Sequence, residues 1–393
     1  MSFLSLFLIC FLSSFQIFNQ SVPNIIEELS ELTTIEITII SSIFPLGQII
    51  GTLLYSFKLS DTLNVQNSFT INAAFILFGS LLQCFATFYL ITIGRLLIGI
   101  GTGIGFVVMG VSLTQCSNYQ TRPAIFLLPS IAFSLGNFFP NFGYLFGSLT
   151  IQYYLIIISI PNILVSFFFY FHGHKIITKT IESNYLEIES IHDPVIPPII
   201  FKYTLLLMCL NVSVGVSFIM TFSIEIFKSF GYTQQSSTGL SFFYPLLQII
   251  FLLLLNIFSK ILTRKRIVLK GFLICFLIQV AITIILLVNF IDDSTKTYLL
   301  GTLTLILAII SSGPCSLIQC LPIELLSTES QYLQISAYAR THLWLFSFTS
   351  TITFPFLFSN FGLLGVILPH TMITGILLSL LSTEFISFLD VPQ

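Results

Sequence analysis

The residues of this chain that could do chemistry are uncharged amides, hydroxyls and one imidazole within long apolar stretches. They are Gln16, Gln48, Gln83, Asn137, Asn211, Ser217, Gln248, Gln319 and His342. Amides and hydroxyls both donate and accept hydrogen bonds, which suits the binding of a neutral polyhydroxyl solute. The same groups can instead join neighbouring helices, where each hydrogen bond contributes about 0.6 kcal/mol. Both interpretations stay open for each residue.

Arg95 is the exception, because it places a charge within an apolar stretch and is followed by GIGTGIG at 99–105. An ion inside a membrane costs several kcal/mol and usually marks a functional position. Arg95 either extends to the outer membrane interface or lines a solute path. The glycines would let two helices approach closely. A dinucleotide-binding fingerprint is not indicated, since no strand precedes them.

Metal-binding and catalytic patterns are not found in the sequence. The seven cysteines are scattered through apolar runs without a CxxC spacing, which is typical of small buried hydrophobic side chains. His342 has no second ligand near it in the sequence. His172, His174, His192 and Asp193 show no recognised catalytic spacing. We therefore expect neither an enzyme nor a bound cofactor.

The composition indicates an integral membrane protein. Of 393 residues, 55% are hydrophobic and 8% are charged, whereas a soluble domain has roughly 25% charged residues. The mean hydropathy is +1.00. A net charge of −2 without a basic stripe argues against nucleic acid as a partner. The expected partners are the lipid bilayer and a small solute, and no obligate protein partner is implied.

The apolar stretches predict an all-α fold. A membrane span needs about 20 apolar residues in a helix, because lipid offers no partners for main-chain groups. Twelve stretches qualify: 3–22, 37–57, 69–90, 93–114, 124–146, 151–171, 200–222, 237–258, 267–290, 297–320, 336–358 and 362–384. The first lacks the basic region and cleavage site of a signal peptide, so we interpret it as a span.

A charged, proline-containing segment divides these spans into two sets of six. The predicted units are an N-terminal bundle at 1–171, a cytoplasmic linker at 172–199, a C-terminal bundle at 200–384 and a tail at 385–393. An N-terminal and a C-terminal set of equal size is typical of transporters built from two repeats.

The distribution of Lys and Arg predicts the orientation. With a cytoplasmic N-terminus, eleven of the fourteen basic residues fall in or beside inner loops: Lys58, Arg122, Lys175, Lys179, Lys202, Lys260, Arg264, Lys265, Arg266, Lys270 and Arg340. Only Arg95, Lys228 and Lys296 fall towards the outside. We expect both termini to be cytoplasmic and the membrane to be the plasma membrane.

Four segments resemble, in order, motifs of the sugar porters of the major facilitator superfamily. They are GRLLIGIGTGIGFVVMGVSLTQCS at 94–117, NVSVGVSFIMTFSIEIFKSFG at 211–231, TRKRIVLKG at 263–271 and GPCSLIQCLPIELL at 313–326. The resemblance runs from about residue 13 to residue 384. It implies two six-helix halves that rock about a site near the membrane midplane, which is an alternating-access mechanism.

The resemblance also implies where the solute binds. The sugar-contacting positions of the family correspond to Ser130, Asn211, Ser217, Gln248, Gln319 and His342, with Trp344 close to the last. Most of these positions differ from the residue that the family carries, but all except Trp344 keep a small or medium-sized polar group. A hexose-type sugar is the expected solute.

A second set of positions corresponds to the charged gate of the family. It comprises Arg122, Glu324, Arg264, Lys265 and Asp61. By resemblance, Arg122, Glu324 and Arg264 would pair at the cytoplasmic ends of the helices when the carrier opens outward. Each such pair should contribute only about 1 kcal/mol near water. That energy suits a gate that opens repeatedly.

The mode of transport is predicted from the first span. Proton-coupled members of the family carry an acidic residue where this chain has Phe15, with Gln16 beside it. Because no carboxylate can titrate there, facilitated diffusion is favoured, and Gln16 joins Arg95 as a candidate for the solute path. Three alternatives stay open: a carrier of a polyol or nucleoside, a non-transporting solute sensor on a carrier scaffold, and a polytopic lipid enzyme.

Overall fold

Every regular element in the described part of the chain is a helix, as the sequence predicts. The computed structural model describes residues 9–11, 13–24, 32–59, 65–115, 117, 121–145, 150–181, 195–258, 264–288, 291–318, 320–323, 326 and 329–388. The elements of the N-terminal part are η1 (Phe15–Gln20), α3 (Thr34–Leu54), η2 (Tyr55–Leu59), α4 (Val65–Gln83), α5 (Phe88–Gln115), α6 (Arg122–Leu145) and α7 (Ile151–Ile181). Those of the C-terminal part are α8 (Pro198–Ser213), α9 (Val216–Ser229), α10 (Gln234–Phe258), α11 (Arg264–Leu287), α12 (Asp293–Leu317), α13 (Cys320–Ile323) and α14 (Glu329–Phe388).

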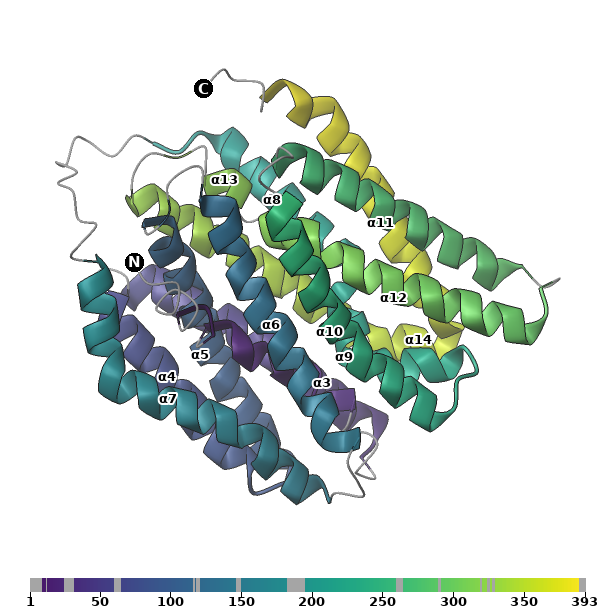
Figure 1. Cartoon of the computed structure of the whole chain (residues 1–393), viewed down its shortest axis with the longest axis horizontal. Helices are drawn as coiled ribbons and strands as arrows, with labels where there is room; N and C mark the ends of the chain where they lie inside the picture. The colour runs from purple at the N-terminus through teal and green to yellow at the C-terminus, as the bar shows by residue number, and fades with distance from the viewer. Residues whose placement is uncertain are drawn as a thin grey trace.

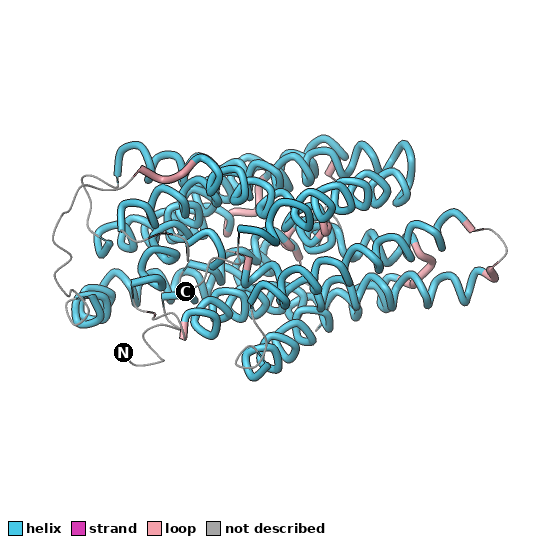
Figure 2. The backbone as a smooth tube through the Cα atoms, turned by 90° about the horizontal axis from the view of Figure 1, so that it is seen from above, coloured by secondary structure: helices cyan, strands magenta, loops and turns pink. Residues whose placement is uncertain are grey.

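The helices form two groups that lie side by side. Most helices coloured purple to teal, from the N-terminal part, lie towards the lower left of Figure 1, and α10, α11 and α12, coloured green, lie towards the right. Figure 2 shows the long helices running in broadly the same direction. This is the all-helical architecture in two halves that the spans predict.

Most predicted spans are found as long apolar helices. Among the described residues, eight stretches are long and apolar enough to cross a membrane: Thr34–Phe57, Phe88–Thr114, Ile151–Phe168, Pro198–Ser229, Gln234–Ile257, Arg266–Leu287, Asp293–Leu317 and Gln331–Ser382. The last contains a bend at Gly362 (φ 63°) and covers two predicted spans. A shorter apolar helix, Ala124–Phe139, coincides with the fifth predicted span.

Two boundaries differ from those predicted. The third span was expected to run to residue 90, but α4 ends at Gln83 and the chain turns at Ala86 (φ 52°) before α5 begins at Phe88. The apolar pattern of the sequence did not reveal this turn, because Phe85 and Phe88 on either side of it are also apolar. Helix α7 continues to Ile181, ten residues beyond the predicted end of the sixth span at residue 171. Part of the predicted linker, 182–194, lies outside the described residues.

Helices α3 and α5 pack unusually close to each other. A Cβ atom on Gly47 would overlap the carbonyl oxygen of Leu96, and one on Gly51 would overlap that of Ile100. On α5, a Cβ atom on Gly103 would overlap the carbonyl oxygen of Gln48. Small residues thus let two main chains meet, as GIGTGIG predicts. The contact holds Arg95, which precedes the glycines of α5, directly against α3.

The seventh predicted span, 200–222, is broken into two helices. Gly215 (φ 88°) separates α8 from α9 and leaves no space for a Cβ atom, which would meet the ring of Phe218. Phe222 has a second non-helical conformation inside α9 (φ −129°, ψ 27°). Breaks of this kind turn main-chain and side-chain polar groups towards the centre of a transporter.

Side-chain caps fix the beginnings of two spans. Thr33 and Glu36 form a capping box at α3, where the Thr33 main-chain N–H donates to Glu36 Oε2 over 2.9 Å. Asp292 accepts hydrogen bonds from Ser294 Oγ (2.7 Å) and from the Thr295 N–H (2.9 Å) ahead of α12. These two bonds lower the pKa of the Asp292 carboxyl to about 2, so the cap stays ionised at any physiological pH.

Candidate functional site

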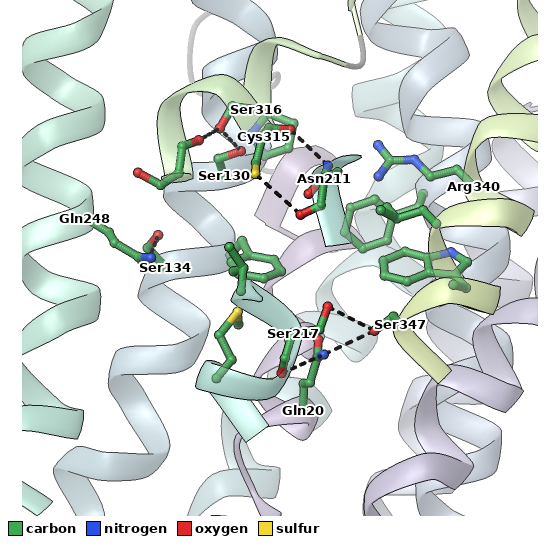
Figure 3. Close-up of a pocket in the computed structure, with 18 residues that line it drawn as sticks. Gln20, Ser130, Ser134, Asn211, Ser217, Gln248, Cys315, Ser316, Arg340 and Ser347 are labelled. Carbon is green, nitrogen blue, oxygen red and sulfur yellow. Dashed lines mark hydrogen bonds between the residues drawn. The ribbon is translucent and has the colours of Figure 1, made fainter. Parts of the chain in front are cut away.

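A cavity lies between the two groups of helices (Figure 3). Its volume is about 100 Å³. A single water needs about 10–15 Å³ on the same measure, so the cavity has space for a small organic molecule. It is lined by Gln20, Phe106, Pro129, Ser130, Phe133, Ser134, Asn211, Val216, Ser217, Met220, Gln248, Ser312, Cys315, Ser316, Arg340, Leu343, Trp344 and Ser347.

Both halves of the protein build this cavity. From the N-terminal half come η1, α5 and α6, and from the C-terminal half come α8, α9, α10, α12 and α14. Neither half encloses it alone. A movement of one half against the other would therefore change the access to the cavity, which is the requirement of alternating access.

One part of the wall joins α6, α8 and α12. Ser316 Oγ on α12 donates to Ser130 Oγ on α6 over 2.6 Å. Asn211 Nδ2 on α8 donates to the Cys315 carbonyl on α12 over 3.5 Å, the outer limit of a hydrogen bond. Among the described residues, the Asn211 amide nitrogen therefore has only this weak hydrogen bond. It is in a position to exchange this weak contact for one with a solute.

Gln248 on α10 is held more firmly. Its Nε2 donates to the Ala308 carbonyl on α12 over 2.6 Å, and its Oε1 accepts from Ser134 Oγ on α6 over 3.4 Å. Gln248 thus lines the cavity and joins three helices at the same time. The sequence analysis left two roles open for Gln248, binding the solute and joining helices. Its position is compatible with both.

A third polar cluster connects the first span to the C-terminal half. Gln20 Nε2 donates to Ser347 Oγ over 3.4 Å and to the Ser217 carbonyl over 3.5 Å. Ser347 Oγ in turn donates to Ser217 Oγ over 3.2 Å. Figure 3 shows these three residues together below the other labelled polar groups. The sequence did not single out Gln20 or Ser347, because neither belongs to the motifs.

Another part of the wall is aromatic and carries one charge. The guanidinium carbon of Arg340 lies 4.6 Å from the centroid of the Phe106 ring, and Phe106 packs edge-to-face on Trp344. Arg340 is 5% exposed. Within the described part of the chain, the buried Nε1–H of Trp344 has no hydrogen-bond acceptor. It is a donor that a solute oxygen could satisfy.

The position of Arg340 adds to what the sequence predicts. The count of basic residues places it beside an inner loop, and the structure shows that its side chain also lines the cavity wall, eleven residues into α14. Arg340, Leu343, Trp344 and Ser347 all line the cavity and follow the spacing of one helix face. That spacing would have identified the residues of α14 that share the face of Trp344.

The structure brings together four of the six predicted solute-binding residues: Ser130, Asn211, Ser217 and Gln248. His342 lies off the face of α14 that lines the cavity. Its Nδ1 donates to the Tyr338 carbonyl over 2.8 Å, and its ring packs on the Tyr338 ring. His342 is therefore not part of the cavity wall. Gln319 lies outside the described residues.

Arg95 is buried within the protein and does not line the cavity. It is fully buried, its Nε donates to the Ile40 carbonyl over 2.7 Å, and its guanidinium carbon is 5.8 Å from the centroid of the Phe44 ring. Its two terminal nitrogens have no hydrogen-bond partner among the described residues. Gln16 is also buried away from the cavity, and its carbonyl accepts from Asn19. Neither residue lines the cavity, and their place on a solute path stays a prediction.

The predicted charged gate is described only at Arg122. Its Nε donates to Ser117 Oγ over 3.2 Å, which stabilises the turn before α6. Arg264 and Lys265 are the first two residues of α11, whereas Asp61 and Glu324 lie outside the described residues. The gate stays a prediction. Among the described residues, no three His, Cys, Asp or Glu side chains gather in a way that could hold a metal ion.

Comparison with known proteins matches both the sequence and the fold. A family profile described as Major Facilitator Superfamily matches residues 3–341. No curated protein sequence matches the chain. A structure of the proton:xylose symporter XylE with bound 6-bromo-6-deoxy-D-glucose superposes with a TM-score of 0.75 at 12% identity, over 97% of this chain and 95% of that chain.

Two other structures agree with this comparison. A partially occluded, inward-open xylose transporter XylE from E. coli gives a TM-score of 0.73 at 13% identity, covering 99% of each chain. The human organic anion transporter MFSD10 gives 0.66 at 12% identity, over 96% of this chain and 97% of that chain. At such identities the likeness establishes the fold alone.

Proposed function

Because this chain belongs to the major facilitator superfamily, we propose that its central cavity carries a small hydroxyl-bearing solute of the sugar class across the membrane. The protein is an integral, multi-pass membrane transporter and not an enzyme. A hexose, the solute that the sequence analysis predicts, is a member of this sugar class. The proposed mechanism is alternating access, in which the two groups of helices rock about the cavity.

The cavity lining is the observation that carries this proposal. Its polar side chains are mostly hydroxyls and amides, contributed by both halves of the protein. Such groups donate and accept, and can replace the water that a hydroxylated solute loses on binding. The aromatic wall of Phe106 and Trp344 adds the flat apolar surface that ligand cavities usually combine with a few polar groups.

Structural neighbours support the proposal only indirectly. Two of those described above are xylose carriers, and a third carries organic anions. The fold therefore accommodates more than one solute class, and the sugar assignment rests on the cavity and on the sequence motifs. Gln319 and His342 are not needed for it, since Asn211, Ser217 and Gln248 already supply hydrogen-bonding groups from three helices.

We propose further that transport is facilitated diffusion. In the first span, Phe15 stands where proton-coupled carriers have an acid. Glu36, in the first turn of α3, is engaged in the capping box with Thr33. Arg95 contacts a carbonyl and a ring, and no described carboxylate lies within ion-pair distance of it. These observations favour a carrier without a proton-linked carboxylate in its N-terminal half.

The orientation and the gate complete the proposal. Both termini are cytoplasmic, the membrane is the plasma membrane, and Arg122, Glu324, Arg264, Lys265 and Asp61 form the inner gate. This arrangement follows from the distribution of basic residues and from the family motifs.

Uptake by the purified protein in liposomes tests the proposed function. A panel of radiolabelled hexoses, hexuronates, polyols and nucleosides should show saturable uptake for a member of the sugar class. If only a nucleoside is taken up, the protein is a nucleoside carrier and the proposed sugar class is wrong. If no member of the panel enters faster than into protein-free liposomes, a sensor rather than a carrier is indicated.

A further inference from the structure

We propose that the solute bears an anionic group, a carboxylate in its simplest form, and that Arg340 binds this group in the central cavity. The inference rests on the proposed function and narrows the class of solute. It also differs from the sequence analysis, which predicts a neutral solute. Four observations support it: the location of Arg340, the absence of other charges among the described lining residues, the contact of the guanidinium with an aromatic ring, and the hydrogen-bond donors nearby.

The first observation is the location of the charge. Arg340 is 5% exposed and lines the central cavity from α14. It also lines a second, smaller cavity of about 20 Å³, together with Pro322 of α13 and Met208 of α8. Arg340 therefore stands at the boundary between two cavities, where a solute that moves from one to the other would pass its side chain.

The second observation is the charge of the lining. Among the described lining residues, every side chain other than Arg340 is uncharged. A cation in a membrane interior is costly and usually marks a site of function. An incoming carboxylate would bring the opposite charge into a region of low dielectric constant, where the attraction is larger than in water.

The third observation is the contact of the guanidinium with an aromatic ring. Its carbon lies 4.6 Å from the centroid of the Phe106 ring, which is the distance of a cation–π contact. A guanidinium has five N–H donors in a planar fork, so it can hold a protein contact and a carboxylate at the same time. Figure 3 shows the Arg340 side chain on the same side of the cavity as Asn211.

The fourth observation is the neighbouring donors. One helical turn further along α14, the buried Nε1–H of Trp344 lacks an acceptor among the described residues. Beside Arg340 in Figure 3, Asn211 Nδ2 makes one hydrogen bond among the described residues, the 3.5 Å contact with the Cys315 carbonyl. A carboxylate accepts hydrogen bonds and donates none, so it matches a wall that presents donors. The hydroxyls of Ser217 and Ser347 are left for the hydroxylated part of the solute.

Glucose and glucuronate provide a matched pair of probes, because they differ only in having a hydroxymethyl or a carboxylate group at the same carbon. Purified protein in liposomes should take up radiolabelled D-glucuronate in preference to D-glucose at equal concentration. Arg340→Gln should lower the affinity for glucuronate by about 10- to 150-fold, the loss expected for a charge-assisted hydrogen bond. It should leave the affinity for glucose within a few-fold, and Arg340→Lys should keep part of the preference.

A control variant and a second measurement accompany this experiment. Arg266→Gln makes the same change at an exposed position of α11 and should leave the preference unchanged. A membrane potential provides a readout that needs no variant, because uniport of a monoanion moves charge. A potassium diffusion potential, negative inside, should slow glucuronate entry into liposomes with the wild-type protein and should not alter glucose entry.

The outcomes separate the two proposals. Uptake of glucose with no preference for glucuronate would overturn the anionic solute and leave the sugar carrier intact. A preference that persists in Arg340→Gln would overturn the assignment to Arg340. Uptake of neither probe, nor of any other sugar, would overturn the proposed function together with this inference.

Discussion

The carboxamide of Asn24 bonds to both ends of one helical turn of α9, at Met220 and at Ile224. Its Nδ2 donates to the Met220 carbonyl over 3.0 Å, and its Oδ1 accepts from the Ile224 N–H over 3.4 Å. An uninterrupted α-helix joins this same pair of main-chain groups. Between them, Phe222 has non-helical torsion angles. A side chain of the N-terminal half thus stabilises the irregular turn of a helix in the C-terminal half.

This relationship predicts that Asn24 helps to close the cavity on the outer side. Asn24→Ala deprives two buried main-chain groups of this partner, and one unmade buried hydrogen bond alone costs about 1–3 kcal/mol. A cysteine in place of Val216, in the cavity wall, should then react about 5- to 150-fold faster with a membrane-impermeant maleimide added outside.

The matched control for this variant is Asn360→Ala. Asn360 is exposed, and its amide bonds to the Phe356 carbonyl within its own helix. It should leave the reaction rate of the cysteine unchanged. Equal rates for Asn24→Ala and the unaltered background would show that Asn24 does not control access to the cavity.

The cavity assignment predicts different effects for two of its amides. Asn211→Ala should weaken solute binding by about 5- to 150-fold, since an unmade buried hydrogen bond costs about 1–3 kcal/mol. Its thermal stability should change little, because its contact with Cys315 is already long. Gln248→Ala should lower both affinity and thermal stability, since its Nε2 bonds closely to the Ala308 carbonyl.

Gln83→Ala is the control for both amide variants. Gln83 is buried in α4, bonds to Asn19 and does not line the cavity. Affinity and melting temperature are measured on the same purified samples. The assignment fails if the two cavity variants bind as the wild type does, or if Gln83→Ala loses as much affinity.

Several features of the fold could be read from the sequence, and particular residues show why others could not. Apolar stretches predict spans because their length must match the bilayer, and GIGTGIG predicts close packing because only small side chains permit it. The break at Gly215 was missed, since a glycine inside an apolar run is compatible with a continuous helix. Asn24 was missed because its partners, Met220 and Ile224, are some 200 residues away and offer main-chain atoms.

The sequence predicted the candidate site only in part. Motif positions on α6, α8, α9 and α10 identified Ser130, Asn211, Ser217 and Gln248, all of which line the cavity. Along α14 the assignment by alignment chose His342, whereas the helix turns Trp344 and Arg340 to the cavity. An error of one or two residues in register changes the face of a helix, because successive side chains point about 100° apart.

The orientation is tested by labelling from either side. Eleven basic residues on one side and three on the other predict that residue 185 faces the cytoplasm and residue 293 the outside. In a background without native cysteines, Asp293→Cys should react with an impermeant reagent in intact cells. Tyr185→Cys should react only after permeabilisation. Reaction of both from one side would contradict the proposed topology.

The absence of an acid at Phe15 predicts that transport does not depend on a proton gradient. Initial uptake of a carried sugar into proteoliposomes should be the same with an imposed inward gradient of protons and after its collapse by an ionophore. Substitution of Phe15 by aspartate would test whether a carboxylate at this position suffices for coupling. A several-fold stimulation of the wild type by the gradient would show that a proton is carried.

Counterflow tests most directly the central claim, that a solute binds in a cavity exposed alternately to each side. Proteoliposomes are loaded with an unlabelled carried sugar and diluted into a trace of the labelled form. A carrier should accumulate label transiently above its equilibrium level, because internal solute competes for the inward-facing cavity and traps the label inside. We expect this overshoot for the wild type and a smaller one for Asn211→Ala. A monotonic approach to equilibrium by wild-type protein, as through an open pore, would contradict the account.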